Sequence, residues 1–262
     1  MDGQGHLHPG DADVIVGLIA SAYEDGPGLS LPAAAFDGLQ ALFPGSHVQY
    51  QVNDVVGRRS VWMEGRDPAG APVFEGPDDV ELELDHYYFD LEWQDPMCGR
   101  ALRTGDRRSV LLSTDFFPTE QDLRNRAFNR EFAPEITSVM AMCLPPHDGY
   151  ERGIVLGREG GPAFSERDRQ VAQLLRPHLE EIWLDAERRR AGVPALTPRE
   201  HEVLALTASG LTHAQIAARL FISVSTVHKH MEHVREHVGV RTAAAAAAMA
   251  LPFAPSRHDG HR

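Results

Sequence analysis

The stretch SVSTVHKHMEHVREHV, residues 223–238, places apolar side chains alternately three and four positions apart. They are Val224, Val227, Met231, Val234 and Val238. This spacing is typical of a helix that buries one face. Ser223 is a preferred residue for the position before a helix, and Gly239 is the usual residue just after one. The sequence therefore predicts a helix whose outward face is polar and carries Lys229.

The segments around this helix also have helix signals. LTPREHEVLALTASG (196–210) begins with Thr197, Pro198 and Glu200, which form the pattern of a capping box with proline at the first helical position. Thr212 precedes a second short helix, HAQIAARLF, and alanine-rich residues 243–251 predict a fourth helix. Two short helices, a tight turn and a third helix with a polar face are the layout of a helix-turn-helix.

Charge separates this region from the rest of the chain. The chain has a formal charge of −13, and residues 1–195 contain 18 arginines against 33 acidic residues. Residues 196–251 carry five basic and four acidic side chains and six histidines. Lys229 is the only lysine in the chain. Because an acidic surface repels phosphate, we expect any nucleic-acid contact to lie in the C-terminal region.

LTPREHEVL, GLTHAQIAARLFIS, STVHKHMEHVREHVGV and the final alanine-rich helix resemble the DNA-binding domain of LuxR-type transcription regulators. The resemblance covers about residues 195–251 and implies binding to double-stranded DNA. His228 and His237 stand where the family often has lysine or arginine, so we expect a lower nonspecific affinity. The predicted DNA-binding residues are Thr212, Ser223, Ser225, Thr226, His228, Lys229, Glu232 and His233.

Within that set, Lys229 puts a fixed positive charge on the early turns of the recognition helix. We expect Lys229 to reach a base edge, and Thr226 and His228 to contact phosphates. The lone lysine also excludes two classes of protein. A phospho-accepting receiver domain and a Walker A loop both need a lysine, and residues 1–228 contain none.

The N-terminal region has mixed signals. Alternating patterns predict strands in a hairpin over 46–54 and 58–66, a third strand over 106–113, and a second hairpin over 137–146 and 150–158. Helices are expected over 11–25, 32–43, 81–94, 119–133 and 165–190. This order predicts an α+β sensor domain of the GAF or PAS type, followed by a small all-α four-helix helix-turn-helix domain. GIVLGREGGPAFSERDRQVAQLLRPHL resembles the closing strand and helix of GAF-like domains.

Sheets of this kind commonly bind a small molecule beneath their covering helices. We expect such a pocket, with Met140 and Met142 as its floor. The predicted pocket residues are His86, Tyr87, Phe89, Trp93, Phe116, Phe128, Phe132, Met140 and Met142. No spaced set of Cys and His residues predicts a metal site, and no cofactor is expected. No hydrolase elbow, zincin motif or phosphate loop is present, so the sequence favours a protein that is not an enzyme.

A homodimer is expected, because the apolar stripe of helix 165–190 continues past the predicted end of the domain. The predicted dimerisation residues are Leu175, Leu179, Ile182 and Trp183. The expected domains are 1–190 for sensing and dimerisation, a linker at 191–195, the DNA-binding domain at 196–251 and a disordered tail at 252–262. The polar N-terminus lacks a secretory signal and no apolar run is long enough to span a membrane, so we expect a bacterial cytoplasmic protein.

The sequence is compatible with two functions. In the first, the chain is a transcription regulator whose N-terminal domain senses a small molecule. In the second, it is a constitutive DNA-binding regulator whose N-terminal domain serves only dimerisation or contact with a protein partner.

Overall fold

The computed structural model describes residues 9–24, 31–57, 59–75, 85–147 and 150–253, with the side chains of 9, 23–24, 74–75, 85–89 and 145–147 left out. The chain divides into two compact units between Ile182 and Trp183, inside helix α7. The sequence pattern ends the first domain later, at residue 190. In the last turn of α7, Arg188 donates a hydrogen bond to the Val193 carbonyl at 2.6 Å.

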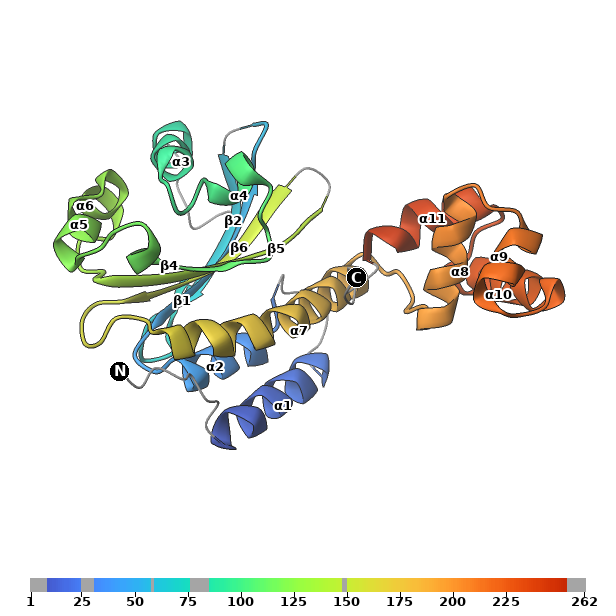
Figure 1. The fold of residues 1–262 in the computed structure, drawn as a ribbon, viewed down its shortest axis with the longest axis horizontal. Coiled ribbons are helices and arrows are strands. Elements are labelled where there is room, and N and C mark those ends of the chain that lie inside the picture. Colours follow the sequence, from blue (N-terminus) through green and yellow to red (C-terminus); the bar gives the residue numbers. More distant parts are fainter. Residues whose placement is uncertain (1–8, 25–30, 58, 76–84, 148–149, 254–262) are drawn as a thin grey trace. The chain divides into compact units, whose positions relative to one another are not determined.

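The first unit is an antiparallel sheet with helices on both faces (Figure 1). Its strands are β1 (His47–Asp54), β2 (Arg59–Arg66), β3 (Pro72–Glu75), β4 (Val110–Leu112), β5 (Ser138–His147) and β6 (Tyr150–Arg158). Its helices are α1 (Pro9–Glu24), α2 (Ala33–Leu42), α3 (Asp85–Gln94), α4 (Arg100–Thr104), α5 (Glu120–Asn125), α6 (Ala127–Phe132) and α7 (Glu166–Arg190), with a 3-10 turn η1 (Ser113–Asp115). The strand order is β3-β2-β1-β6-β5-β4.

The register of the sheet decides which side chains share a face. Val48, Leu156, Met140 and Leu112 stand opposite one another across β1, β6, β5 and β4, and all four are buried. Figure 1 shows α2 and α7 on one face of the sheet and α3 to α6 on the other. The alternate row contains Gln49, Val155 and Ala141, and Val155 and Ala141 pack against the cluster of Met97 and Leu123 on the side of α3 to α6. The first row therefore faces α2 and α7. Because side chains alternate along each strand, the two rows cannot exchange faces without a shift of register.

The predicted α+β class and both predicted hairpins are confirmed. Strand β3 and helix α4 are additional elements, and the strand predicted over 106–113 shortens to β4. The helical stretch predicted over 119–133 is two helices. The break falls at Arg126, whose backbone is extended (φ −55°, ψ 134°). Its guanidinium forms an ion pair with Asp95, with Nε 2.5 Å from Oδ2 and both side chains buried.

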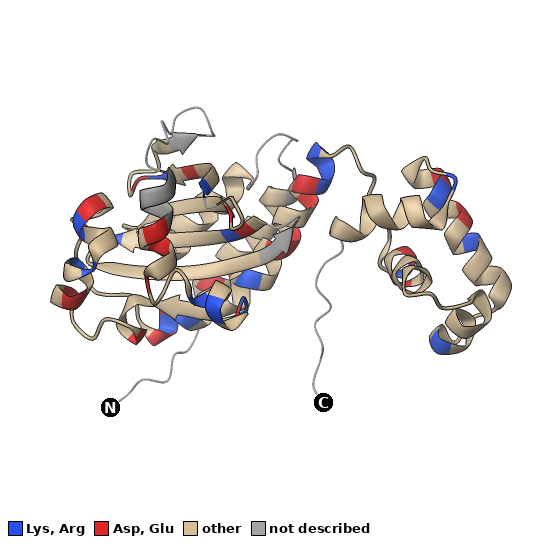
Figure 2. Ribbon diagram, turned by 90° about the horizontal axis from the view of Figure 1, so that it is seen from above, with Lys and Arg blue, Asp and Glu red and all other residues tan. Residues whose placement is uncertain are grey.

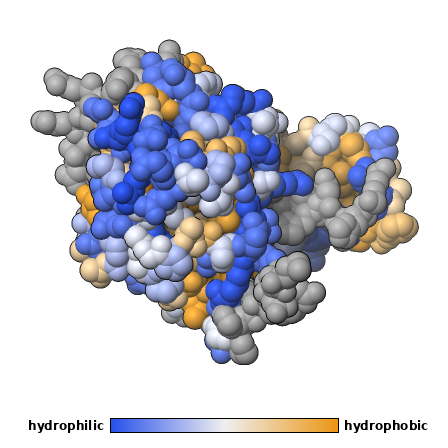
Figure 3. Space-filling view, turned by 60° about the vertical axis from the view of Figure 1, so that its left-hand side comes forward, coloured by the Kyte–Doolittle hydropathy of each residue, from blue (hydrophilic) through white to orange (hydrophobic). Residues whose placement is uncertain are grey.

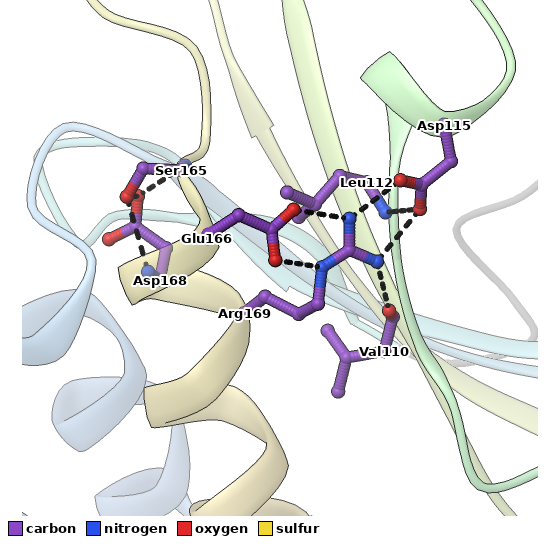
Figure 4. A network of polar contacts seen from close by, with 7 residues as sticks. All are labelled: Val110, Leu112, Asp115, Ser165, Glu166, Asp168 and Arg169. Carbon is purple, nitrogen blue, oxygen red and sulfur yellow. Dashed lines mark hydrogen bonds and ion pairs between the residues drawn. The ribbon is translucent and has the colours of Figure 1, made fainter. Parts of the chain in front are cut away.

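Arg169 joins the first turn of α7 to the edge of the sheet (Figure 4). Its guanidinium donates to Asp115 at 2.6 and 2.8 Å, to the Val110 carbonyl at 2.9 Å and to Glu166 at 3.0 Å. The Asp115 carboxylate also accepts from the Leu112 backbone N–H at 2.9 Å. The predicted capping box of α7 is present, since Ser165 N donates to Asp168 Oδ2 at 2.8 Å and Asp168 N donates to Ser165 Oγ at 3.2 Å.

The second unit contains four α-helices: α8 (Pro198–Ala208), α9 (His213–Leu220), α10 (Val224–Val238) and α11 (Ala243–Ala250), with a 3-10 turn η2 (Leu251–Phe253). Capping boxes begin α8 at Thr197 and Glu200, as predicted, and α9 at Thr212 and Gln215. Side chains of all four helices meet in one core that also includes Val193 and Leu196. The predicted all-α fold is confirmed.

The surface of the first unit is mixed in character. Arginines alternate with acidic residues along its elements (Figure 2). The face shown in Figure 3 is mainly hydrophilic, with small hydrophobic patches. Across the described part of the chain, no helix is both long and apolar enough to cross a membrane.

Candidate nucleic-acid interface and cavity

The buried stripe of α10 fixes which way its polar face points. Val227, Met231, Val234 and Val238 are at most 7% exposed. Val224, predicted as the first member of this stripe, is 43% exposed, because it lies in the first turn beyond the reach of the core. The turn before α10 is tight, since Phe221 adopts a left-handed backbone conformation (φ 54°).

Of the eight predicted DNA-binding residues, seven are exposed and Thr226 is half-buried. Three hydroxyl groups are occupied by the helix cap: Ser223 Oγ accepts from the Thr226 N–H at 3.1 Å and lies 2.8 Å from the hydroxyls of Ser225 and Thr226. Lys229, Glu232 and His233 are exposed on the outward face of α10. Within the described ranges, Lys229 makes no ion pair or hydrogen bond, so its charge is available to a ligand.

The structure adds His213 to this surface. His213 Nδ1, in the first turn of α9, lies 3.2 Å from His228 Nε2 on α10, and the two rings meet edge to face. One imidazole must therefore donate to the other. These residues are far apart in sequence, so only the angle between α9 and α10 brings them together. A helix-turn-helix packs these two helices against each other. The predicted helix-turn-helix could therefore have indicated that His213 and His228 lie close together.

The first unit has a cavity of about 350 Å³ between its sheet and helices α3 and α6, called here the sheet cavity. Its floor includes Gln49, Gln51, Val139 and Val155. Gly153 and Gly157 of β6 carry no side chain on this face, which leaves room between sheet and helices. A smaller cavity of about 60 Å³ adjoins it and shares Gln51, Glu92 and Cys98 with it.

The predicted pocket residues separate in the structure. Phe128 and Phe132 line the sheet cavity, and Trp93 lines the smaller one. Met140 and Met142 do not form a floor, because the register turns them to the opposite face, where both are buried. Phe116 packs instead in a cluster around Met97, Leu123 and Val139. The side chains of His86, Tyr87 and Phe89 lie outside the described residues.

A buried polar cluster, which the sequence did not indicate, borders both cavities. Gln51 Nε2 donates to Glu92 Oε1 at 2.5 Å, and Asn53 Nδ2 donates to Glu92 Oε2 at 3.3 Å. Burial raises the pKa of the Glu92 carboxyl, against the lowering effect of these hydrogen bonds. Burial also raises the pKa of the Cys98 thiol to about 12, so Cys98 is a neutral thiol.

The four predicted dimerisation residues, Leu175, Leu179, Ile182 and Trp183, are at most 1% exposed within a single chain. Contacts within the single chain already bury their apolar surface, so these side chains do not offer it to a second chain. Leu174, next to them on α7, is 51% exposed. Among the described residues, no group of three or more His, Cys, Asp and Glu side chains is arranged to hold a metal ion.

Comparison with known proteins identifies the second unit. Residues 194–250 match the family described as bacterial regulatory proteins, luxR family. The monoamine regulon transcriptional regulator of Klebsiella aerogenes is 35% identical over 114 residues, which cover 42% of this chain and 49% of that protein. The transcriptional activator protein RaiR of Rhizobium etli is 40% identical over 72 residues, covering 27% and 30%. The chain thus spans less than half the length of these two curated relatives.

A solved structure of the GAF domain from an Acinetobacter phosphoenolpyruvate-protein phosphotransferase covers 73% of this chain and 100% of that domain, at 11% identity and a TM-score of 0.45. At that TM-score the likeness defines no ligand. Both named relatives are transcription regulators rather than enzymes. The C-terminal domain of this chain, with its capped α9, tight turn and outward polar face of α10, therefore matches the luxR family of bacterial regulatory proteins over residues 194–250.

Proposed function

We propose that the chain is a sequence-specific, DNA-binding transcription regulator whose N-terminal domain responds to a small molecule. The observation that carries the DNA-binding part is the outward face of α10, where Lys229 is exposed and forms no ion pair with any described residue, while the opposite stripe is buried. A helix with this division of faces fits the major groove and presents its early turns to base edges. The family match of residues 194–250 and the regulatory role of both named relatives support the same proposal.

The sensing part rests on the sheet cavity. At about 350 Å³ it falls within the range of small-molecule sites, and apolar walls with a few convergent polar groups are typical of such sites. The competing function is a constitutive regulator whose N-terminal domain only dimerises or contacts a protein. Native mass spectrometry of the purified full chain distinguishes the two. A small molecule retained by the chain supports sensing. The constitutive function is supported if the chain carries no ligand and small molecules do not change its DNA affinity.

The DNA-binding proposal is tested by selection from a randomised duplex library with the full chain, followed by affinity measurements on the enriched site. We expect one enriched motif, bound at least a hundredfold more tightly than unrelated duplex, since specific and nonspecific affinities usually differ by about 10³ or more. A library with no enriched motif would contradict a sequence-specific regulator.

We further propose that the chain is a homodimer. Because Leu175, Leu179, Ile182 and Trp183 are buried within one chain, the contact must use other surface, and Leu174 on α7 and Val16 on α1 are exposed apolar candidates. Light scattering at micromolar concentration is expected to give the mass of two chains. Leu174→Glu should shift that mass toward one chain while leaving the fold intact. A monomer with and without DNA would remove the proposal.

DNA binding is expected to tighten by several-fold from pH 8 to pH 6. An imidazole ordinarily titrates near pH 6.5, and a protonated ring beside phosphate is favoured. His213 and His228 form a contact pair on the candidate surface, where any added positive charge would lie near phosphate. His201 will not contribute, because burial lowers the pKa of its imidazole.

Fluorescence anisotropy at fixed salt measures the change in DNA affinity with pH. His228→Ala should reduce the pH dependence and His201→Ala should not, whereas equal affinities of the wild-type chain at both pH values would refute the expectation.

A further inference from the structure

The sheet cavity ends at a carboxylate that lacks a cation. Glu92 is 7% exposed and, among the described residues, its carboxylate forms no ion pair. It accepts hydrogen bonds from the side-chain amides of Gln51 and Asn53, at 2.5 and 3.3 Å. Neutral amides satisfy part of the hydrogen-bonding capacity of a carboxylate, but they do not balance its charge.

The two amides are held in this orientation by a second set of hydrogen bonds. Gln49 Nε2 donates to Gln51 Oε1 at 3.1 Å, and Ser60 Oγ donates to Asn53 Oδ1 at 3.0 Å. Each amide oxygen is thereby occupied, and each amide nitrogen points to Glu92. The site is therefore organised around an acceptor at Glu92, which is the form that an ionised carboxylate presents.

The nearest buried cation, Arg126, is already engaged. Its Nε lies 2.5 Å from Asp95 Oδ2, its Nη2 lies 3.1 Å from Cys98 Sγ, and its guanidinium stacks over Phe128 at 4.8 Å. Arg126 and Asp95 balance each other, and Cys98 is neutral because burial raises the pKa of its thiol to about 12. The charges of Glu92, Asp95, Arg126 and Cys98 therefore sum to one negative charge when Glu92 is ionised.

Apolar side chains form the part of the cavity wall around Phe128 and Phe132. Phe128 and Phe132 lie with ring centroids 5.5 Å apart, and Ile136, Val139 and Val155 complete the lining near them. Charged residues line the cavity elsewhere, and Glu135 among them is exposed. A ligand that fits both the apolar wall and the Glu92 carboxylate has a compact apolar or aromatic body and one positively charged group.

We propose that the sheet cavity binds a small organic amine, with the ammonium group paired to the Glu92 carboxylate and the apolar body against Phe128, Phe132 and Val155. This rests on the proposed sensing function and names the class of its ligand. A neutral hydrogen-bond donor would leave the buried charge uncompensated, whereas an ammonium removes it. Burial raises the pKa of Glu92, and a bound cation would reverse that effect.

The test uses the full chain and matched pairs of probes of similar size: 2-phenylethylamine with 2-phenylethanol, benzylamine with benzyl alcohol, and hexylamine with hexanol. Calorimetry at pH 7.5 is expected to show at least one amine binding at least tenfold more tightly than its alcohol. In Glu92→Gln, which keeps the size of the side chain, that amine should bind at least tenfold more weakly. Glu131→Gln, which changes an exposed carboxylate of α6 outside the cavity lining, is the matched control and should bind as the wild type does.

The proposal is overturned if no amine binds, if each alcohol binds as well as its amine, or if Glu92→Gln retains the amine affinity with its melting temperature unchanged. DNA affinity measured in parallel separates this result from the proposed function. An amine that binds without changing DNA affinity supports the site but contradicts sensing by that ligand. If another molecule alters DNA affinity through the N-terminal domain and no amine binds, sensing stands and the amine assignment fails.

Discussion

Replacing Asp95 by asparagine is expected to lower the free energy of unfolding of the N-terminal domain by about 3–5 kcal/mol. The side chains of Asp95 and Arg126 are 2% and 5% exposed, so the guanidinium has little access to water. Without the Asp95 carboxylate, Arg126 keeps the Cys98 sulfur and two aromatic rings as direct contacts among the described residues, and Glu92 as a nearby charge. Asp95 also accepts from the backbone N–H groups of Met97 and Cys98, which asparagine can still bond through its single carbonyl oxygen. The lost free energy of unfolding therefore comes mainly from burying the Arg126 guanidinium without the Asp95 carboxylate.

Urea denaturation followed by tryptophan fluorescence measures this change, since Trp93 is close to Asp95 in the chain. Glu120→Gln is the matched control: it breaks the exposed ion pair with Arg124, in which the two side chains are 56% and 48% exposed. Exposed pairs contribute at most about 1 kcal/mol. In the double variant Asp95→Asn with Arg126→Met, the buried ion pair is removed as a whole and much of the stability should return. A loss in Asp95→Asn no larger than in Glu120→Gln would show that Arg126 finds another partner.

The elements that sequence analysis predicted correctly are those whose signals lie within a few residues. The capping box of Thr197 and Glu200 joins positions one helical turn apart, and the stripe from Val227 to Val238 repeats at helical spacing. Such signals are complete within one segment. The hairpin of β5 and β6 was predicted for the same reason, because its strands are adjacent in the chain.

The errors lie where distant segments decide the outcome. Alternation along β5 predicts two faces but does not say which face meets the cavity, and the pairing with β6 and β4 placed Met140 and Met142 on the side of α7. Glu92 stands among other acidic residues, and only the contacts with Gln51 and Asn53 of β1 reveal its burial. The break at Arg126 likewise depends on Asp95, which belongs to a different part of the chain. Tertiary packing therefore overrides the local helical pattern at that position.

Lys229→Ala is expected to weaken binding to the preferred DNA site by about 1–3 kcal/mol, or about five- to 150-fold, and to flatten the preference at one base pair of each half-site. Lys229 is exposed on the early turns of α10, away from the buried stripe, and no described residue competes for its ammonium group. A lysine there can donate to the O6 and N7 atoms of guanine. Affinities for the enriched site and for a set of single-base variants of it measure the change.

His228→Ala is the matched comparison, because His228 is the neighbouring residue on the same helix but contacts His213 at the start of α9, and we expect it to meet a phosphate rather than a base. It should weaken all sequences about equally and reduce the salt dependence of binding, whereas Lys229→Ala should change their ranking. If Lys229→Ala instead weakens every variant site by the same factor, the lysine binds the backbone. Specificity would then have to come from Ser225, Glu232 and His233, which share the outward face, or from the shape of the DNA.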